Sequence, residues 1–326
     1  MSKHIIGIDI GGTKVKIGLL DVDGNIITKW EINTNISDNG SFIVDEIWDS
    51  IQSKFVIQGN HNILGLGIGA PGFVDTKTGL VHEAVNIGWR DFELGKLFKE
   101  KTDLPVFVEN DANIAALGEN WKGAGEQVDD LIIVTLGTGV GSGIISNGIV
   151  LQGTNGTAGE IGHIIVAPNG YPCNCGRVGC LDTIASANGV VRHAKDVIKE
   201  NPTSELAKIF YANNHISSKE IFELAKQGDI HCIHIIDNVA DALGIALANA
   251  ATILNPSKIL IGGGLSKAGE MFLSKIDTAF VTYSLKRISE VTQINFAQLG
   301  NDAGIVGAAY LVKTCLCSNN YLSVES

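Results

Sequence analysis

Three apolar runs open the chain, and short polar or glycine-rich segments separate them. The runs are HIIGIDI, VKIGLLD and NIITKWEI, and the separators are GGTK and DVDGN. Runs of this length that are rich in Ile, Val and Leu predict strands, and Asp23-Gly24 is a typical hairpin dipeptide. We therefore expect an antiparallel meander over residues 5–30.

The apolar period then changes to that of a helix, with Phe42, Ile43, Ile47, Ile51 and Phe55 on one face. A buried strand at 63–68, an amphipathic helix at 91–101 and a short strand at 105–108 follow, and the last leads into a helix that begins in ENDAN, residues 109–113. This alternation of strands and helices predicts an α/β fold.

The pattern of the N-terminal part returns in the second half of the chain. A strand at 131–136, a glycine-rich turn at 137–143 and a strand at 143–150 make TLGTGVGSGIISNGIVL an echo of DIGGTKVKIGLLDVDGNII. Helices then dominate, up to a strand at 258–264 and a last apolar helix around 305–316. The echo predicts two related lobes. We place a small lobe at 1–115, a large lobe at 116–303, and at 304–326 a helix and tail, the helix packing back on the small lobe.

Composition and charge exclude several classes of protein. The 326 residues are 45% hydrophobic and 18% charged with a net charge of −11, which is ordinary for a soluble globular protein and disfavours nucleic-acid binding. The most apolar long segment, 235–254, is interrupted by polar residues, so we expect a buried helix and no membrane span. The first apolar run begins so early that it leaves no room for a signal peptide, and we expect a cytoplasmic protein.

Glycine-rich turns follow three of the predicted strands. Their bare N–H groups can surround phosphate oxygens, Thr hydroxyls add donors, and an acid at the strand end, Asp9, can hold Mg²⁺. A single turn of this kind is equally well explained as a simple hairpin, but three of them predict a binding site for a nucleoside triphosphate. The candidate phosphate- and ATP-binding residues are Asp9, Gly11, Gly12, Thr13, Lys14, Gly137, Thr138, Gly139, Gly263 and Gly264.

Asp111 in ENDAN is the candidate for acid–base chemistry. An aspartate where a helix begins is often no more than an N-cap. Here Asn110 and Asp111 lie between the first two phosphate turns in chain order. A carboxylate in a cleft can accept a proton from a sugar hydroxyl while that oxygen attacks the γ-phosphate of ATP.

Five motifs taken together, DIGGTK, ENDAN, LGTGVGSG, GTAGEIGH and CNCGRVGCLD, resemble one family. They are similar to the ROK family of bacterial sugar kinases and repressors, and most of all to its glucokinases. The resemblance implies a two-lobed actin-like ATPase (ribonuclease H-like) fold with a ligand cleft between the lobes. It also implies ATP with Mg²⁺, a hexose phosphorylated at its 6-hydroxyl, and a homodimer or homotetramer.

The resemblance implies roles for single residues as well. Asp111 becomes the catalytic base, and the implied sugar contacts are Asn86, Asn110, Asp111, Glu160 and His163. One position departs from the family pattern: a glutamate usually stands two residues after the last cysteine, where it contacts the sugar, and this chain has Asp182. We keep Asp182 as a sugar-binding candidate. Glucose is the first hypothesis for the substrate, with N-acetylmannosamine, mannose, allose and fructose as alternatives.

One histidine and three cysteines lie close together in the chain: His163, Cys173, Cys175 and Cys180. They supply the Cys₃His ligands of a structural zinc site, and a disulfide is the poorer explanation in a reducing cytoplasm. The Cys-x-Cys spacing is tighter than the usual finger spacing, and the family resemblance supports the metal. We expect structural Zn²⁺ that orders the segment carrying Glu160.

Two other functions are suggested by single features, a DNA-binding regulator and an NAD-dependent enzyme. Repressor relatives carry an added DNA-binding region before the first phosphate turn, which here begins at Asp9, and the acidic charge is unfavourable for a DNA-binding regulator. GLGIGA at 65–70 matches a dinucleotide fingerprint, but Pro71 and Gly72 follow where a helix would have to open. We therefore expect a loop there and no NAD site.

Overall fold

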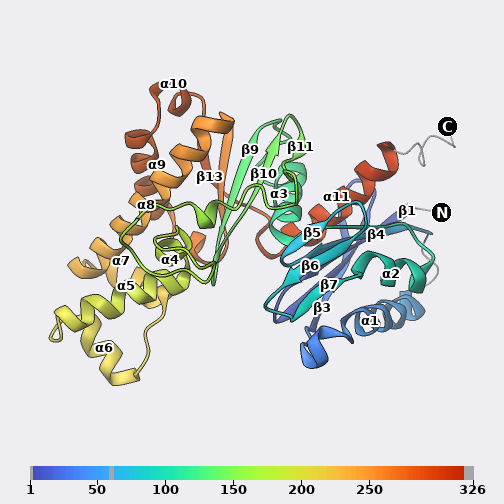
Figure 1. The fold of residues 1–326 in the computed structure, drawn as a ribbon, viewed down its shortest axis with the longest axis horizontal. Coiled ribbons are helices and arrows are strands. Elements are labelled where there is room, and N and C mark those ends of the chain that lie inside the picture. Colours follow the sequence, from blue (N-terminus) through green and yellow to red (C-terminus); the bar gives the residue numbers. More distant parts are fainter. Residues whose placement is uncertain (1–2, 59–61, 319–326) are drawn as a thin grey trace.

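The computed structural model describes residues 3–58 and 62–318, which form two lobes side by side (Figure 1). Each lobe is built on a five-stranded mixed sheet, and helices surround the sheets. The α/β class predicted from the alternating pattern is confirmed.

The sheet of the first lobe has the order β3-β2-β1-β4-β8. The meander predicted at the N-terminus is present, because β2 pairs antiparallel with both β1 and β3. Strands β4 and β8 run parallel to β1, so the carboxyl ends of these three strands meet at one edge of the sheet. The strands are β1 (Lys3–Ile10), β2 (Lys14–Asp21), β3 (Ile26–Asn33), β4 (Asn62–Ala70) and β8 (Val106–Asn110).

The sheet of the second lobe repeats this arrangement with the order β11-β10-β9-β12-β13. Strand β10 pairs antiparallel with β9 and β11, whereas β12 and β13 are parallel to β9. The weak sequence echo therefore corresponds to a repeated topology. The strands are β9 (Leu131–Leu136), β10 (Val140–Ser146), β11 (Ile149–Val150), β12 (Lys258–Gly262) and β13 (Gln293–Phe296).

Three local expectations were wrong. The glycine turn after β9 ends at Gly139, because Gly141 and Gly143 already pair with β9 as part of β10. The helix expected from residue 91 begins at Leu94, since Asp91 lies in strand β7 with a φ of 45°. The segment GLGIGA is the second half of β4 and not a loop.

A small third sheet, which the hydrophobic pattern did not predict, lies beside the first. Its strands are β5 (Phe73–Asp75), β6 (Leu80–Ala84) and β7 (Trp89–Phe92), in that order. Strands this short show too few alternations to be recognised. The turn between β6 and β7 carries Asn86, so this sheet positions one of the sugar-binding candidates.

Helices α1 (Ile43–Gln58) and α2 (Leu94–Thr102) pack in the first lobe. The second lobe contains most of the described helices. The longest of them, α8, is long and apolar enough to cross a membrane, with a mean hydropathy of 1.4. Most of its apolar residues, among them Leu243 and Leu247, are buried in the core of this lobe, as the pattern predicts. The helices here are α4 (Asp182–Ala185), α5 (Ala187–Glu200), α6 (Glu205–Asn213), α7 (Ser218–Lys226), α8 (Ile230–Leu254), α9 (Glu270–Tyr283) and α10 (Lys286–Ser289).

Two helices lie between the sheets, α3 (Asp111–Lys122) and α11 (Ala303–Ser318) (Figure 1). Helix α3 contacts β9 and β10, whereas α11 contacts β1 and β4, and the two helices contact each other. Apolar residues of α11 such as Val306 and Val312 pack with Ile5 and Leu20 of the first lobe. The C-terminal tail expected after this helix, from residue 319 onward, lies outside the described residues. The pair of helices therefore joins the two lobes.

Candidate active site

The first glycine turn follows β1 and is closed by its own backbone. The N–H of Gly11 donates to the carbonyl of Lys14 at 3.0 Å, and the Thr34 hydroxyl donates to the carbonyl of Gly11 at 2.6 Å. Gly12 and Thr13 stay exposed at the tip. A Cβ on Gly12 would lie 3.5 Å from the Cβ of Asn86, so the turn and this sugar-binding candidate are adjacent.

Asp9 stands at the base of this turn. Lys16, its partner across β1 and β2, donates to Asp9 Oδ2 at 3.3 Å. Burial raises the pKa of Asp9, and the charge of Lys16 opposes that rise. Lys14 instead forms an ion pair with Glu31 at 2.9 Å, and both of its members are exposed. Lys16 is thus the cation that contacts the acid of the turn, although only Lys14 was named from the sequence.

Asp111 is the first residue of α3, directly after β8 ends. Its carboxylate accepts from the N–H of Ala112 at 2.8 Å. Burial, together with the negative charges of Asp9 and Glu160, raises the pKa of Asp111 to about 6, and the Ala112 hydrogen bond opposes this rise. Three carboxylates from β1, α3 and the GTAGEIGH segment therefore act on one another in the same region.

The two residues before Asp111, Glu109 and Asn110, hold the backbone around it. Asn110 caps α3, accepting from the N–H groups of Ala112 and Asn113 at 2.9 and 3.2 Å, and its amide donates to the carbonyl of Gly72 at 2.9 Å. The N-cap of α3 is therefore Asn110, and not Asp111 as the alternative interpretation of the sequence proposed. The buried Glu109 accepts from the Asn110 N–H at 2.8 Å.

Glu109 also links the two halves of the molecule. Gln152, in the segment after β11, donates to Glu109 Oε2 at 2.7 Å and accepts from the Thr76 hydroxyl at 3.2 Å. Neither Glu109 nor Gln152 was expected from the sequence to be a functional residue. A single glutamine in a loop carries no pattern that would have revealed this contact.

The second glycine turn, Gly137–Gly139, joins β9 to β10. Its Gly137 N–H donates to the carbonyl of Gly139 at 2.9 Å. Asp182, expected to contact the sugar, accepts from the N–H of Val140 at 2.7 Å, where the turn ends. Two residues further along β10, Ser142 accepts from the N–H of Ile161 at 3.0 Å, which connects the strand to the segment carrying Glu160.

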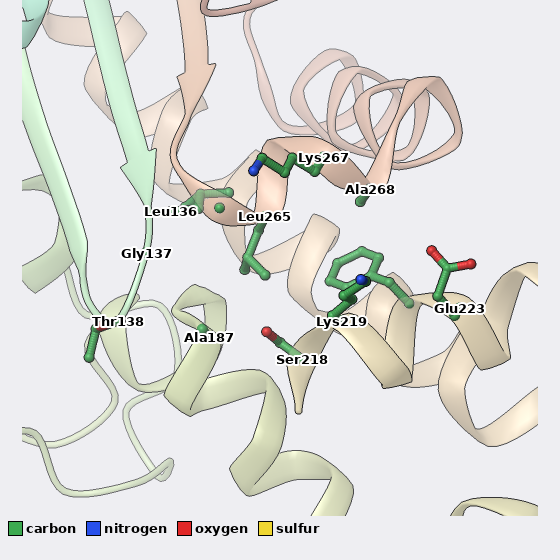
Figure 2. Close-up of a pocket in the computed structure, with 12 residues that line it drawn as sticks. Leu136, Gly137, Thr138, Ala187, Ser218, Lys219, Glu223, Leu265, Lys267 and Ala268 are labelled. Atoms are coloured by element: carbon green, nitrogen blue, oxygen red, sulfur yellow. The ribbon is translucent and has the colours of Figure 1, made fainter. Parts of the chain in front are cut away.

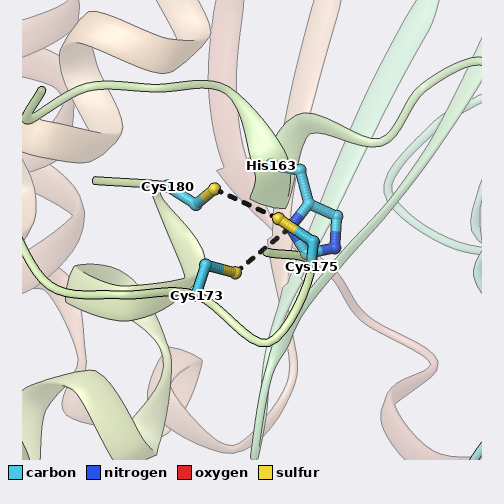
Figure 3. A group of neighbouring side chains, drawn as sticks. All are labelled: His163, Cys173, Cys175 and Cys180. Carbon is cyan, nitrogen blue, oxygen red and sulfur yellow. Dashed lines mark hydrogen bonds between the residues drawn. The ribbon is translucent and has the colours of Figure 1, made fainter. Parts of the chain in front are cut away.

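The structure brings His163, Cys173, Cys175 and Cys180 together (Figure 3). Their potential ligand atoms all lie within 4.8 Å of one another. His163 Nδ1 lies 3.6 Å from Cys173 Sγ, and Cys175 Sγ lies 3.6 Å from Cys180 Sγ. Hydrogen bonds from Arg177 lower the pKa of the Cys175 thiol to about 6, which favours a thiolate at neutral pH. The His163–Cys173 pair and the Cys175–Cys180 pair together form a compact set of nitrogen and sulfur donors.

A cavity of about 420 Å³ opens beside the second turn (Figure 2). Gly137, Thr138 and Gly264, all expected to bind ATP, line it. Its other walls come from α5, α7 and the segment after β12, and were not predicted because helical residues facing a cavity show the same pattern as residues facing solvent. These additional residues are Leu136, Ala187, Ser218, Lys219, Phe222, Glu223, Leu265, Lys267 and Ala268.

The comparison with protein families decides the assignment. Residues 5–315 match the family model described as ROK family. The chain belongs to the ROK family. The matched residues include all five motifs that carried the resemblance, and the fold is the two-lobed actin-like ATPase fold that the resemblance implied.

Members of the ROK family with different functions are similar to this chain. A glucokinase of Halalkalibacterium halodurans is 47% identical over 94% of each chain. The crystal structure of a ROK family glucokinase from Streptomyces griseus in complex with glucose and AMPPNP is 38% identical, with a TM-score of 0.79 over 95% of this chain and 99% of that one. A xylose repressor of Caldicellulosiruptor bescii is 33% identical over 94% of this chain and 77% of the repressor.

Proposed function

We propose that this protein is an ATP-dependent glucokinase that transfers the γ-phosphoryl group of ATP to the 6-hydroxyl of glucose. The observation that carries the proposal is the placement of Asp111, a partly buried carboxylate at the start of α3 whose pKa is raised to about 6. The 47% identity to a glucokinase over most of the chain supports glucose as the hexose.

In the proposed reaction Asp111 accepts the proton of the 6-hydroxyl as the sugar oxygen attacks the γ-phosphorus. The bond from that phosphorus to the β,γ-bridging oxygen breaks, and ADP leaves with the bonding electrons. A base with a pKa of about 6 is ionised at neutral pH and still basic enough to accept the proton. Closure of the cleft would exclude water, which otherwise competes with the sugar as the acceptor.

The two glycine turns are proposed to hold the phosphates. Gly11, Gly12 and Thr13 offer N–H groups and a hydroxyl from the first lobe, and Gly137 to Gly139 do so from the second. Asp9 would hold the Mg²⁺ that accompanies ATP, and Lys16 would keep that carboxylate ionised through its ion pair. Positive charge and N–H groups then surround the phosphoryl group being transferred.

The cavity in Figure 2 is proposed to bind the nucleoside part of ATP. Phe222, Leu265 and Ala268 offer an apolar wall for a base, while Lys219 and Lys267 add positive charge. Thr138 lies at the end of the cavity that continues into the phosphate turn. This places the base in the second lobe and directs the phosphates toward the cleft.

The sugar is proposed to contact Asn86, Asn110, Glu160 and His163. Asn86 lies next to the first phosphate turn, and Glu160 is near enough to Asp111 to influence its pKa. Asn110 already serves as the cap of α3, so we assign its remaining amide hydrogen to the sugar. These residues come from both lobes, as a cleft that closes on its substrate requires.

His163, Cys173, Cys175 and Cys180 are proposed to hold a structural Zn²⁺. Three thiolates and an imidazole are the donors that zinc prefers, and their spread of at most 4.8 Å fits one ion. The ion takes no part in the chemistry. It would keep His163 and the neighbouring Glu160 in place.

The first test is a coupled assay of ADP release from MgATP with glucose, mannose, fructose, allose, N-acetylglucosamine and N-acetylmannosamine. We expect glucose to be preferred and Asp111→Ala to lose on the order of 10²–10⁴-fold in kcat. Asp49→Ala, an exposed residue of α1, is the matched control and should be unchanged. Near-normal turnover by Asp111→Ala would refute the mechanism, and preference for another sugar would refute the assignment of glucose.

A second candidate, a sugar-responsive regulator without catalysis, is favoured only by the similarity to a xylose repressor. Binding of a sugar in calorimetry without turnover on any sugar of the panel would establish it.

Two further proposals are that the protein is a homodimer or homotetramer and that it remains in the cytoplasm. Light scattering of the purified protein gives the native mass, and cell fractionation gives the location.

A further inference from the structure

The second phosphate turn is held at both ends by the residues that follow the cysteine cluster. Asp182 Oδ1 accepts from the N–H of Val140 at 2.7 Å, and the N–H of Ala187 donates to the carbonyl of Gly137 at 2.8 Å. A Cβ on Gly139 would lie 2.9 Å from the same Asp182 oxygen. Asp182 therefore lies directly against the turn.

We propose that Asp182 is a positioning residue for the phosphates of ATP. This inference rests on the proposed function and assigns Asp182 a task other than the sugar contact expected from the family pattern. Its side chain is one methylene shorter than the usual glutamate, and the carboxylate ends at the backbone of the turn.

The physical reason lies in the glycines of the turn. Gly137 and Gly139 would lose more conformational entropy on becoming ordered than other residues. A hydrogen bond from a backbone N–H to an ionised carboxylate is stronger than one to a neutral acceptor. By fixing Val140, Asp182 keeps the turn in one conformation before the nucleotide arrives, so less of the binding free energy is lost in ordering it.

The hydrogen bond between Asp182 and Val140 also connects the cysteine cluster to the proposed nucleotide site. Cys180 pairs with Ile165 in an isolated bridge, and Leu181 donates to the carbonyl of Ile164 at 2.9 Å. Asp182 begins α4 directly after these contacts. A cluster that orders this segment therefore orders the phosphate turn as well as the sugar-binding segment.

The experiment measures AMPPNP binding by calorimetry, together with the separate KM values for ATP and glucose, in Asp182→Ala and Asp182→Asn. We expect Asp182→Ala to weaken AMPPNP binding and raise the KM for ATP by roughly tenfold, the effect of losing one charge-assisted hydrogen bond, with glucose KM within about twofold. Asp182→Asn keeps an acceptor oxygen but loses the charge, so both values should lie between those of Asp182→Ala and the wild type.

Asp196→Ala is the matched control. Asp196 on α5 accepts from Tyr171 and Lys199, so it contacts the cysteine-bearing segment but not the phosphate turn. It should leave nucleotide affinity unchanged. All variants should retain the metal content of the wild type, because Asp182 is not part of the Cys₃His set.

A rise in glucose KM in Asp182→Asn, with unchanged AMPPNP binding, would overturn the proposal and make Asp182 a sugar ligand, even if Asp182→Ala fails to fold. Loss of metal together with both affinities would also overturn it. A wild-type protein that binds AMPPNP but does not phosphorylate glucose would contradict the proposed substrate. The nucleotide-binding comparison would then still decide the role of Asp182.

Discussion

Asp111 determines the pH range in which the proposed reaction can run. Only the ionised carboxylate can accept the sugar proton, and its pKa is raised to about 6. We therefore expect kcat/KM to fall as pH decreases through about 6, approaching tenfold per pH unit below it, and to be level above about pH 7. A pH–rate profile of the wild type measures this. A profile that stays flat down to about pH 5 would contradict the assignment of Asp111 as the base.

The same burial makes Asp111 costly for stability. Its pKa in the folded state is raised from 3.8 to about 6, so the stability gained by protonation is present at low pH and lost as pH rises through about 6. At neutral pH the buried charge opposes folding. Asp111→Asn should therefore raise the free energy of unfolding by about 1–3 kcal/mol near pH 7 and by little near pH 4.

Urea unfolding of Asp111→Asn and wild type at the two pH values tests this, with Asp49→Asn as the exposed control. Equal stabilisation at both pH values would show that the charge of Asp111 is not the cause. The expected combination of higher stability and lost turnover is typical of a residue retained for catalysis.

At the scale of elements, the cysteine-bearing segment lies between the residues proposed for the two substrate sites. It follows the segment of Glu160 and leads into α4, where Asp182 contacts the phosphate turn. Since much of this segment is turn and irregular structure, a bound ion would replace the regular hydrogen bonding that stabilises helices and sheets.

Cys175→Ser should therefore abolish stoichiometric zinc and raise the KM for glucose on the order of tenfold, because His163 loses the ion that orients it. Metal analysis and steady-state kinetics measure the two effects. Cys317→Ser is the matched control, since Cys317 is also exposed but lies near the end of α11. Full zinc content and a normal KM in Cys175→Ser would refute the proposed metal site.

At the scale of the whole molecule, the joint between the lobes depends on close contact of α3 and α11. A Cβ on Gly307 would lie 1.7 Å from the carbonyl oxygen of Ile114, and one on Gly118 would lie 2.2 Å from that of Ala303. Only glycine allows the two backbones to approach this closely. Because Asp111 begins α3, the crossing also determines where the proposed base lies relative to the second lobe.

Gly307→Ala should lower the free energy of unfolding by about 3 kcal/mol and reduce kcat, since the helices must separate. Thermal unfolding and turnover measure both. At Gly228, with a φ of 94°, no described atom lies within 4 Å of an added Cβ, so Gly228→Ala should cost only about 1 kcal/mol of strain. Equal losses in the two variants would show that crowding at the crossing is not the cause.

The sequence by itself determined the features that depend on neighbours in the chain. The meander, the strands before the glycine turns and the repeated topology follow from apolar periodicity and turn residues, which act over a few positions. The Cys₃His set was also visible, because its spacing brings the four residues together within one segment. Family membership followed from motifs that are each continuous in the chain.

Tertiary structure decided what depends on residues far apart in the chain. Gln152 contacts Glu109 across the lobes, Lys16 rather than Lys14 contacts Asp9, and α7 lines the cavity proposed for the nucleoside. Asp182 had a single expected partner, the sugar, until packing placed the Val140 N–H 2.7 Å from its carboxylate. Periodicity describes which face of an element is buried, but hydrogen bonds and pKa values depend on which atoms the fold brings within a few ångströms.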